Sequence, residues 1–267
     1  MITALIVNEL RNKTGLGMME CKKYLTESAG NVEAAMELIR KAGVKTSISQ
    51  RTTGEGRVLV HASADQKSAA VVELLCNTDF TAKSEPVAAL LKQAAEIALA
   101  GGDPASDAKV KDGLVAVSQT TGENIQLGRV KVLKNAAGKV GTYYYSVSGK
   151  IGVIASVTGA PADDLLHNLC LHITAFKPVA LGMTREAVPV ELIEKERAIA
   201  IEEAKATGKP EAIAVKIAEG KLASFFKERV LPEQEFVNPE KFKGSIGDML
   251  KKANVTLVEY ARIEVGA

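Results

Sequence analysis

An acidic residue stands next to a large aromatic ring, at Asp79 and Phe80, in an otherwise polar stretch of the chain. The stretch, residues 77–86, follows an apolar run that predicts a buried strand (68–76) and precedes one that predicts an amphipathic helix (87–100). It is therefore expected to be a loop at the end of a strand, where rigid scaffolds often present functional side chains. An exposed aromatic beside a charge can be a hot spot for a protein partner. The alternative is that Phe80 folds back as a core plug and Asp79 caps the next turn.

The sequence carries no motif for catalysis or for nucleotide binding. A Gly-x-x-x-x-Gly-Lys-Ser/Thr phosphate loop is missing, and residues 122–129 have the wrong spacing for one. His167, Cys170 and His172 share part of a predicted helix, but the two histidines are five positions apart and point in different directions. Polar or core side chains are therefore favoured there over metal ligands. With no Ser, His and Asp set in hydrolase context, we expect neither an enzyme nor a bound cofactor or metal.

The composition is that of an ordinary globular protein: 267 residues, 46% of them hydrophobic and 25% charged, with a net charge of +2. A charge this close to balance does not predict a nucleic-acid partner. The start of the chain lacks the pattern of a secretory signal, and no apolar run has the length of a membrane span. The scattered cysteines form no Cys-x-x-Cys pair, which favours reduced core thiols. We therefore expect a cytoplasmic protein that binds neither nucleic acid nor membrane.

Hydrophobic spacing predicts an α+β protein built from several parts. Residues 1–45 predict a three-helix bundle of the ubiquitin-associated (UBA-like) type, and residues 46–56 predict a linker. Strands followed by a helix then occur twice, which predicts two α+β subdomains with antiparallel sheets, a core N-subdomain at 57–135 and a core C-subdomain at 136–267. Two helices joined by a Thr-Gly-Lys-Pro reversal predict an inserted antiparallel helical hairpin, a coiled coil, at about 188–231. The pairing of strands within the sheets cannot be read from the sequence.

Two of these parts could contact a partner, and each has a structural alternative. Met18 and Met19 lie beside Gly15 and Gly17, where they could form an adaptable binding edge or simply fill the small core of the bundle. The hairpin has a charged outside, so it could protrude as a contact arm or pack as a structural element. Its predicted seam consists of Val215, Ala218, Leu222 and Phe225.

Four motifs follow one another along nearly the whole chain. They occupy residues 7–11 with 14–23, residues 76–83, residues 149–153 with 171–178, and residues 207–210 running to 233–237. The first reads Val-Asn-Glu-Leu-Arg and Thr-Gly-Leu-Gly-Met-Met-Glu-Cys-Lys-Lys, and the second reads Cys-Asn-Thr-Asp-Phe-Thr-Ala-Lys. In this order, the motifs resemble those of the bacterial translation elongation factor Ts family, the guanine-nucleotide exchange factors for elongation factor Tu.

The resemblance implies a bundle that docks on the G domain of elongation factor Tu, in its GDP-bound and nucleotide-free states, together with a two-part core and a coiled-coil insertion. It also implies that the Thr-Asp-Phe loop is the working edge. The implied partner-binding residues are Thr78, Asp79, Phe80, Thr81 and Lys83 in the loop, and Leu10, Arg11, Gly15, Gly17, Met18 and Met19 in the bundle.

The exchange mechanism follows from what holds a nucleotide in a GTPase, namely backbone amides, a lysine and a magnesium ion. Phe80 would wedge into an apolar cleft of the G domain, and Asp79 would disturb the surroundings of the ion. The alternative function is a non-catalytic adaptor or chaperone-like scaffold that uses the bundle and the hairpin as binding surfaces. Such a scaffold would be indifferent to changes at Asp79 and Phe80.

The chain departs from the family pattern in three places. Residues 46–53 replace the usual basic, alanine-rich linker, and Tyr145 stands where many members carry a histidine. Some members have a further helical module at the C-terminus, whereas this sequence stops at Ala267, so we expect that contact to be missing. The sequence leaves self-association open.

Overall fold

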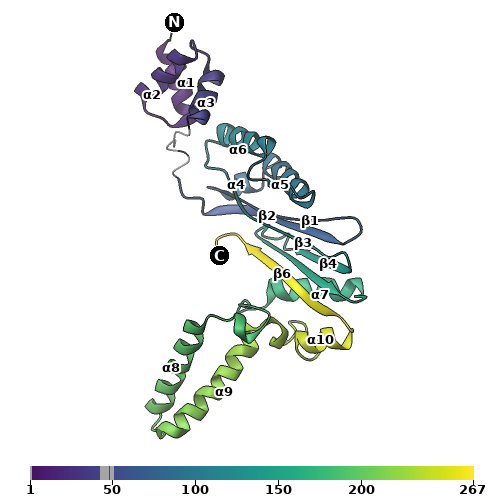
Figure 1. Cartoon of the computed structure of the whole chain (residues 1–267). Helices are drawn as coiled ribbons and strands as arrows, with labels where there is room; N and C mark the ends of the chain where they lie inside the picture. The colour runs from purple at the N-terminus through teal and green to yellow at the C-terminus, as the bar shows by residue number, and fades with distance from the viewer. Residues whose placement is uncertain (1, 43–47, 49–50) are drawn as a thin grey trace.

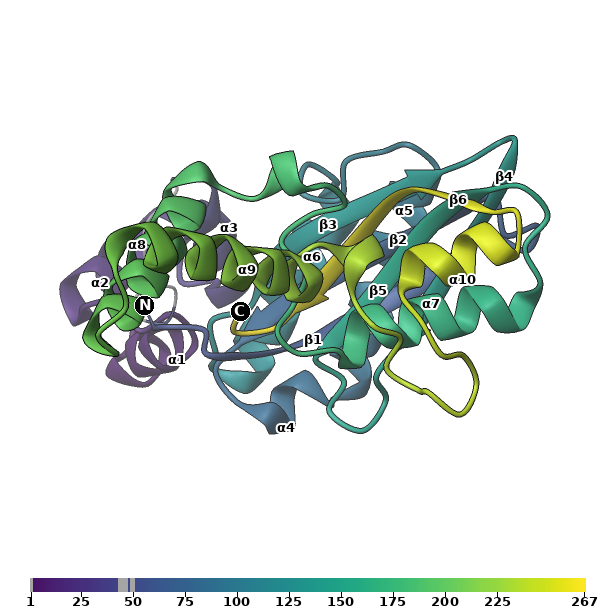
Figure 2. The ribbon, with the colours of Figure 1, turned by 90° about the horizontal axis from the view of Figure 1, so that it is seen from below.

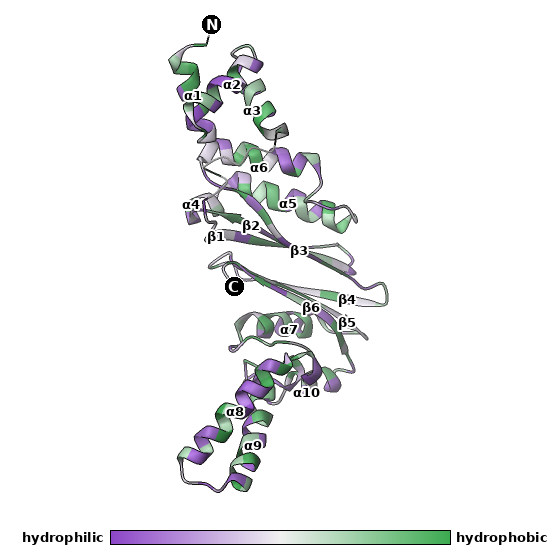
Figure 3. Ribbon diagram, turned by 60° about the vertical axis from the view of Figure 1, so that its left-hand side comes forward, coloured by the Kyte–Doolittle hydropathy of each residue, from purple (hydrophilic) through white to green (hydrophobic). Residues whose placement is uncertain are grey.

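The computed structural model describes residues 2–42, 48 and 51–267. Over these residues the chain is an elongated α+β protein in which two antiparallel sheets lie between groups of helices (Figure 1). The predicted α+β class is confirmed. The layers follow one another as helices, sheet, sheet and helices, with the N-terminal helices beyond one end and a helical hairpin beyond the other (Figure 3).

The N-terminal helices form a small bundle with its own core. They are α1 (Ala4–Thr14), α2 (Met18–Glu27) and α3 (Val32–Lys41). Their shared core includes Leu10, Cys21 and Leu25, all fully buried. Gly15 ends α1 in the left-handed region at φ +66°, which glycine adopts without the strain of a side chain. Residues 43–47, 49 and 50, at the end of the predicted bundle and in the first part of the predicted linker, lie outside the described residues.

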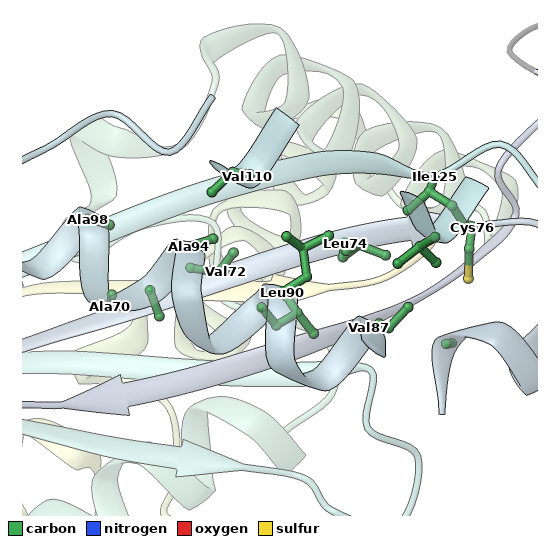
Figure 4. Close-up of a cluster of buried hydrophobic side chains, with 14 residues drawn as sticks. Ala70, Val72, Leu74, Cys76, Val87, Leu90, Ala94, Ala98, Val110 and Ile125 are labelled. Carbon is green, nitrogen blue, oxygen red and sulfur yellow. The ribbon is translucent and has the colours of Figure 1, made fainter. Parts of the chain in front are cut away.

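The first sheet has the order β1-β2-β3, formed by β1 (Glu55–Ala62), β2 (Ser68–Cys76) and β3 (Gln126–Lys134). Its outer face is covered by α5 (Glu85–Leu99) and α6 (Ala108–Thr121), which pack Leu90, Ala94 and Val110 onto the sheet (Figure 4). β1 begins at Glu55, so the last two residues assigned to the predicted linker belong to a strand.

The second sheet has the order β4-β5-β6, formed by β4 (Gly138–Tyr144), β5 (Ile151–Thr158) and β6 (Thr256–Glu264). β4 ends at Tyr144, where the chain turns back toward β5. Two helices, α7 (Asp163–Ala175) and α10 (Ile246–Lys252), cover the outer face of this sheet (Figure 2).

The inner faces of the two sheets pack against each other through Val58, Val71, Val140, Ile154 and Ile263. The approach is so close at Gly152 that a Cβ atom there would lie 2.6 Å from Val58 Cγ1. An ion pair adds a polar connection, because Arg129 of β3 binds the buried Glu73 of β2 and also donates to the Glu264 carbonyl of β6 at 2.7 Å. The two subdomains are thus joined by apolar contacts and by a guanidinium group.

A hairpin of α8 (Val190–Ala206) and α9 (Glu211–Arg229) projects away from the second sheet (Figure 1). Short 3-10 turns, η1 (Arg185–Ala187) and η2 (Leu231–Glu233), lie at its base. On α9 the buried seam is Ala214, Ala218 and Leu222. The predicted place of Val215 in the seam is wrong, because that side chain is 43% exposed. Across the described ranges, no helix is both long enough and apolar enough to span a bilayer.

Candidate protein-docking site

The predicted loop after β2 contains a single helical turn, α4 (Asp79–Ala82). Thr78 caps it: its backbone is extended and its side chain accepts a hydrogen bond from the Thr81 amide at 3.3 Å. The alternative in which Asp79 is the cap is therefore wrong. Asp79 instead accepts a hydrogen bond from Lys83 Nζ at 2.8 Å, one helical turn later. That lysine lowers the pKa of Asp79 below its ordinary value, so the carboxylate is ionised at neutral pH.

Phe80 points into solvent and is 84% exposed. The alternative of a core plug is therefore wrong. The opposite side of the turn is buried, since Thr81 and Ala82 are 6% and 4% exposed. Thr81 thus supports the turn from within and is not an accessible contact residue, which corrects its predicted role. The result is an exposed aromatic ring, beside an ionised acid, on a turn anchored to the core.

Glu123, which follows the end of α6, lies under this turn and was missed in the sequence analysis. One of its carboxylate oxygens accepts the backbone N–H groups of Asn77 and Thr78, each at 3.0 Å. The other accepts the hydroxyls of Thr78 and Thr81 at 2.6 and 2.7 Å. Partial burial by itself would raise the pKa of Glu123, but the hydrogen bonds from Thr78 and Thr81 outweigh it and lower the pKa. These contacts cross more than 40 positions of sequence, so spacing carried no signal for them.

A hollow of about 590 Å³ lies beside α4, where the two subdomains meet. Asp79 and Lys83 line it from the first subdomain, and the turn between β4 and β5 lines it from the second. Val147 in that turn is 81% exposed. Tyr145 lines a different hollow, of about 330 Å³, with Tyr143, Ile151, Leu171, Thr174 and Ala175. Tyr145 is therefore not a lining residue of the hollow beside Asp79.

The bundle presents a second exposed surface. Met18 and Met19 are 54% and 77% exposed at the start of α2, so the alternative in which they fill the core is wrong. Gly17 directly precedes them as the helix cap, and Arg11 is exposed on α1. Leu10 is fully buried, so its predicted role as a direct contact is corrected to that of a core residue. Figure 1 shows the bundle beyond α6 and away from α4, so the two predicted contact regions are separate.

The two histidines and the cysteine of α7 have packing roles. His172 is buried, with Nε2 at 3.0 Å from the Gln234 side-chain oxygen and Nδ1 accepting the Val237 amide at 3.1 Å. Burial raises the pKa of the Cys170 thiol to about 12. His167 lies against the ring of Tyr143. Within the part of the chain that the structure describes, no three His, Cys, Asp or Glu side chains are grouped as a metal site would require.

Known proteins match this chain along its length. A family model described as "Elongation factor TS" matches residues 77–267. Elongation factor Ts of Gluconobacter oxydans (strain 621H) is 38% identical over 284 residues, covering 99% of this chain and 92% of that protein. Elongation factor Ts of Thioalkalivibrio sulfidiphilus (strain HL-EbGR7) is 39% identical over 279 residues with the same coverage, and that of Chlorobaculum parvum (strain DSM 263 / NCIMB 8327) is 35% identical over 287 residues, covering 100% and 99%. The chain belongs to the elongation factor Ts family.

The matches to the elongation factor Ts family extend over both candidate surfaces. The family model begins at Asn77 and so includes the α4 turn, Glu123 and the hairpin. The individual relatives extend the similarity over the N-terminal bundle. Each candidate surface of this family member thus has an exposed apolar feature, Phe80 on the α4 turn and the Met18–Met19 pair on the bundle.

Proposed function

We propose that this protein is a guanine-nucleotide exchange factor that releases GDP from elongation factor Tu during translation elongation, with the α4 turn as its working edge. The observation that carries the proposal is the exposed ring of Phe80, held beside ionised Asp79 on a capped turn. Its family membership supplies the class of partner. Exchange makes and breaks no covalent bond, so the protein is not an enzyme in the chemical sense.

The proposed mechanism uses the two side chains for different tasks. Phe80 enters an apolar cleft of the partner's G domain and displaces the elements behind the magnesium site. Asp79 then exchanges its contact with Lys83 for the polar groups and water around the ion, which weakens the hold on the phosphates. Because linkage is reciprocal, the bound factor weakens the binding of GDP by as much as bound GDP weakens the binding of the factor.

One ring does not provide the whole effect. A change in nucleotide affinity of about 10⁴ requires roughly 5.5 kcal/mol of differential binding. Burying a phenylalanine side chain contributes about 1.5–3 kcal/mol. The remainder has to come from a wider interface, and the exposed Met18–Met19 edge is a suitable second contact.

The parts of the chain then take separate roles. The bundle at residues 1–45 acts as a UBA-like module that docks on the G domain, and the hairpin acts as a coiled-coil contact arm. The partner is bound in its GDP-bound and nucleotide-free states, in the cytoplasm, without a nucleic-acid or membrane partner. The near-balanced charge of +2 agrees with a protein partner.

The test is release of a fluorescent GDP analogue from elongation factor Tu, with this protein at a small fraction of the partner's concentration. We expect every molecule of elongation factor Tu to release its GDP analogue, and we expect Asp79→Ala to slow this release. Asp163→Ala is the matched control, because Asp163 is also an exposed, ion-paired acid in the first turn of a helix. If the protein is instead a scaffold, it should bind its partner stoichiometrically, and the two variants should not differ in the rate of GDP release.

A further inference from the structure

We infer that Glu123 is a positioning residue for nucleotide exchange: it fixes the backbone of the α4 turn so that Phe80 is presented in the conformation that the partner binds. The inference rests on the proposed function and assigns Glu123 no contact with the partner or the nucleotide. Its basis is the set of hydrogen bonds between this carboxylate and residues on either side of Asp79 and Phe80.

Phe80 needs such support because its own packing does not determine where it lies. With 84% of its surface exposed, the ring makes few contacts that could hold it, so its position follows from the backbone of residues 78–81. A wedge that is already ordered before binding loses less conformational entropy on entering its cleft than one that must be ordered there. The rigidity of the turn therefore contributes directly to the rate of exchange.

The carboxylate suits this role because it only accepts hydrogen bonds and has two oxygens to do so. One oxygen receives the backbone N–H groups of Asn77 and Thr78, the two residues that lead into the turn. The other receives two hydroxyls, one from the cap Thr78 and one from Thr81 inside the turn. Hydrogen bonds to an ionised acceptor are roughly twice as strong as bonds between neutral groups. The lowered pKa of Glu123 agrees with a carboxylate that stays charged in the fold.

Glu123 is itself anchored to α6. Its carbonyl accepts the Ser118 hydroxyl at 2.6 Å, and its amide donates to the Thr121 hydroxyl at 3.2 Å. The backbone N–H of the next residue, Asn124, donates to the side-chain oxygen of Asn77 at 2.8 Å. The turn is therefore fixed to a neighbouring helix through Glu123, and α4 does not depend on its own single turn for rigidity.

The experiment compares the rate of GDP release from elongation factor Tu with Glu123→Ala and with wild type, each over a range of concentrations. We expect the maximal release rate to fall about tenfold or more, as donors at the turn lose their charged acceptor, while the half-saturating concentration changes less. Glu123→Gln should recover much of the rate, because its amide oxygen can accept the backbone donors and its NH₂ can donate to the hydroxyls. An unchanged maximal rate for Glu123→Ala would overturn the inference.

A double-mutant cycle separates positioning from a general loss of folding. If Glu123 acts through the ring, Glu123→Ala should have little further effect in a Phe80→Ala background. Equal losses in both backgrounds would show that Glu123 acts elsewhere, and the inference would fail. Thr81→Val removes one hydroxyl with little change of shape and should slow release in the same way, whereas Thr120→Val, whose hydroxyl bonds within α6, should not.

A measurement without the partner keeps this inference distinct from the proposed function. Amide hydrogen exchange at residues 77–83 should be faster in Glu123→Ala than in wild type, with the strands of the first sheet unchanged. If wild type failed to accelerate GDP release from elongation factor Tu, but residues 77–83 still exchanged faster in the variant, the proposed function would be wrong and the positioning of the turn would stand. If the turn exchanged at the same rate in both proteins, the inference itself would be wrong.

Discussion

Truncating Phe80 should separate its effect on binding from its effect on stability. Replacing a buried phenylalanine by alanine costs about 3–5 kcal/mol. Phe80 is 84% exposed, so only roughly a sixth of that cost applies, about 0.5–0.8 kcal/mol. For a protein of this size the midpoint of thermal unfolding should then fall by about 1–3 °C. Loss of a ring that is buried in the partner should slow GDP release by about 10- to 150-fold, since burying it contributes about 1.5–3 kcal/mol.

The matched control is the same substitution at Phe236, which is 5% exposed in the second subdomain. Phe236→Ala should lower the thermal midpoint by about 6–20 °C and leave the release rate per folded molecule near normal. Thermal melts and stopped-flow release assays on both variants give the comparison. If Phe80→Ala unfolds as early as Phe236→Ala and its folded molecules still accelerate GDP release at the wild-type rate, Phe80 is a core residue and not a contact with the partner.

Three further changes test the fold and the second surface. Deleting residues 1–50 should weaken binding to elongation factor Tu and leave the thermal unfolding of the core unchanged, because the bundle has its own core; unchanged affinity would contradict docking by the bundle. Gly152→Ala should lower the unfolding free energy by about 1–3 kcal/mol in denaturant titrations, because its Cβ would collide with Val58. Gly220→Ala, in a helix with open space around it, should not destabilise the protein. Equal effects of the two changes would contradict the close packing of the sheets. Burial lowers the pKa of His172 below its usual 6.5, so its neutral form stabilises the fold above that pH and this contribution is lost as pH falls. The free energy of unfolding should therefore drop more between about pH 7 and pH 5 in wild type than in His172→Gln. Equal drops in the two proteins would exclude this role.

Local sequence patterns predicted the elements well because burial imposes a period on each of them. The run at 68–76 is apolar nearly throughout, and the structure places it as the central strand of a sheet, covered on both faces. The pairing of β6 with β5 was not predictable, because it joins strands about 100 residues apart and no short-range pattern specifies it. Val215 was assigned to the hairpin seam since it has the right spacing, but the smaller Ala214 lies there.

The candidate site was predicted in its position and only partly in its construction. A charge and a ring in a polar loop indicated Asp79 and Phe80, and the exposure of Phe80 excluded the core plug. Motif membership alone assigned Leu10 and Thr81 to the partner contact, although both side chains are buried. Glu123 carries no local signal, because its role depends on α6 ending next to α4 in space.

We expect the binding of this protein and the binding of GDP to elongation factor Tu to oppose each other. The most direct test is to measure the affinity of the protein for its partner by calorimetry, once with GDP bound and once without nucleotide. GDP should weaken the affinity of elongation factor Tu for this protein by the same factor by which the protein weakens its affinity for GDP. Equal affinity for the two states of the partner would contradict this expectation and would favour the scaffold function.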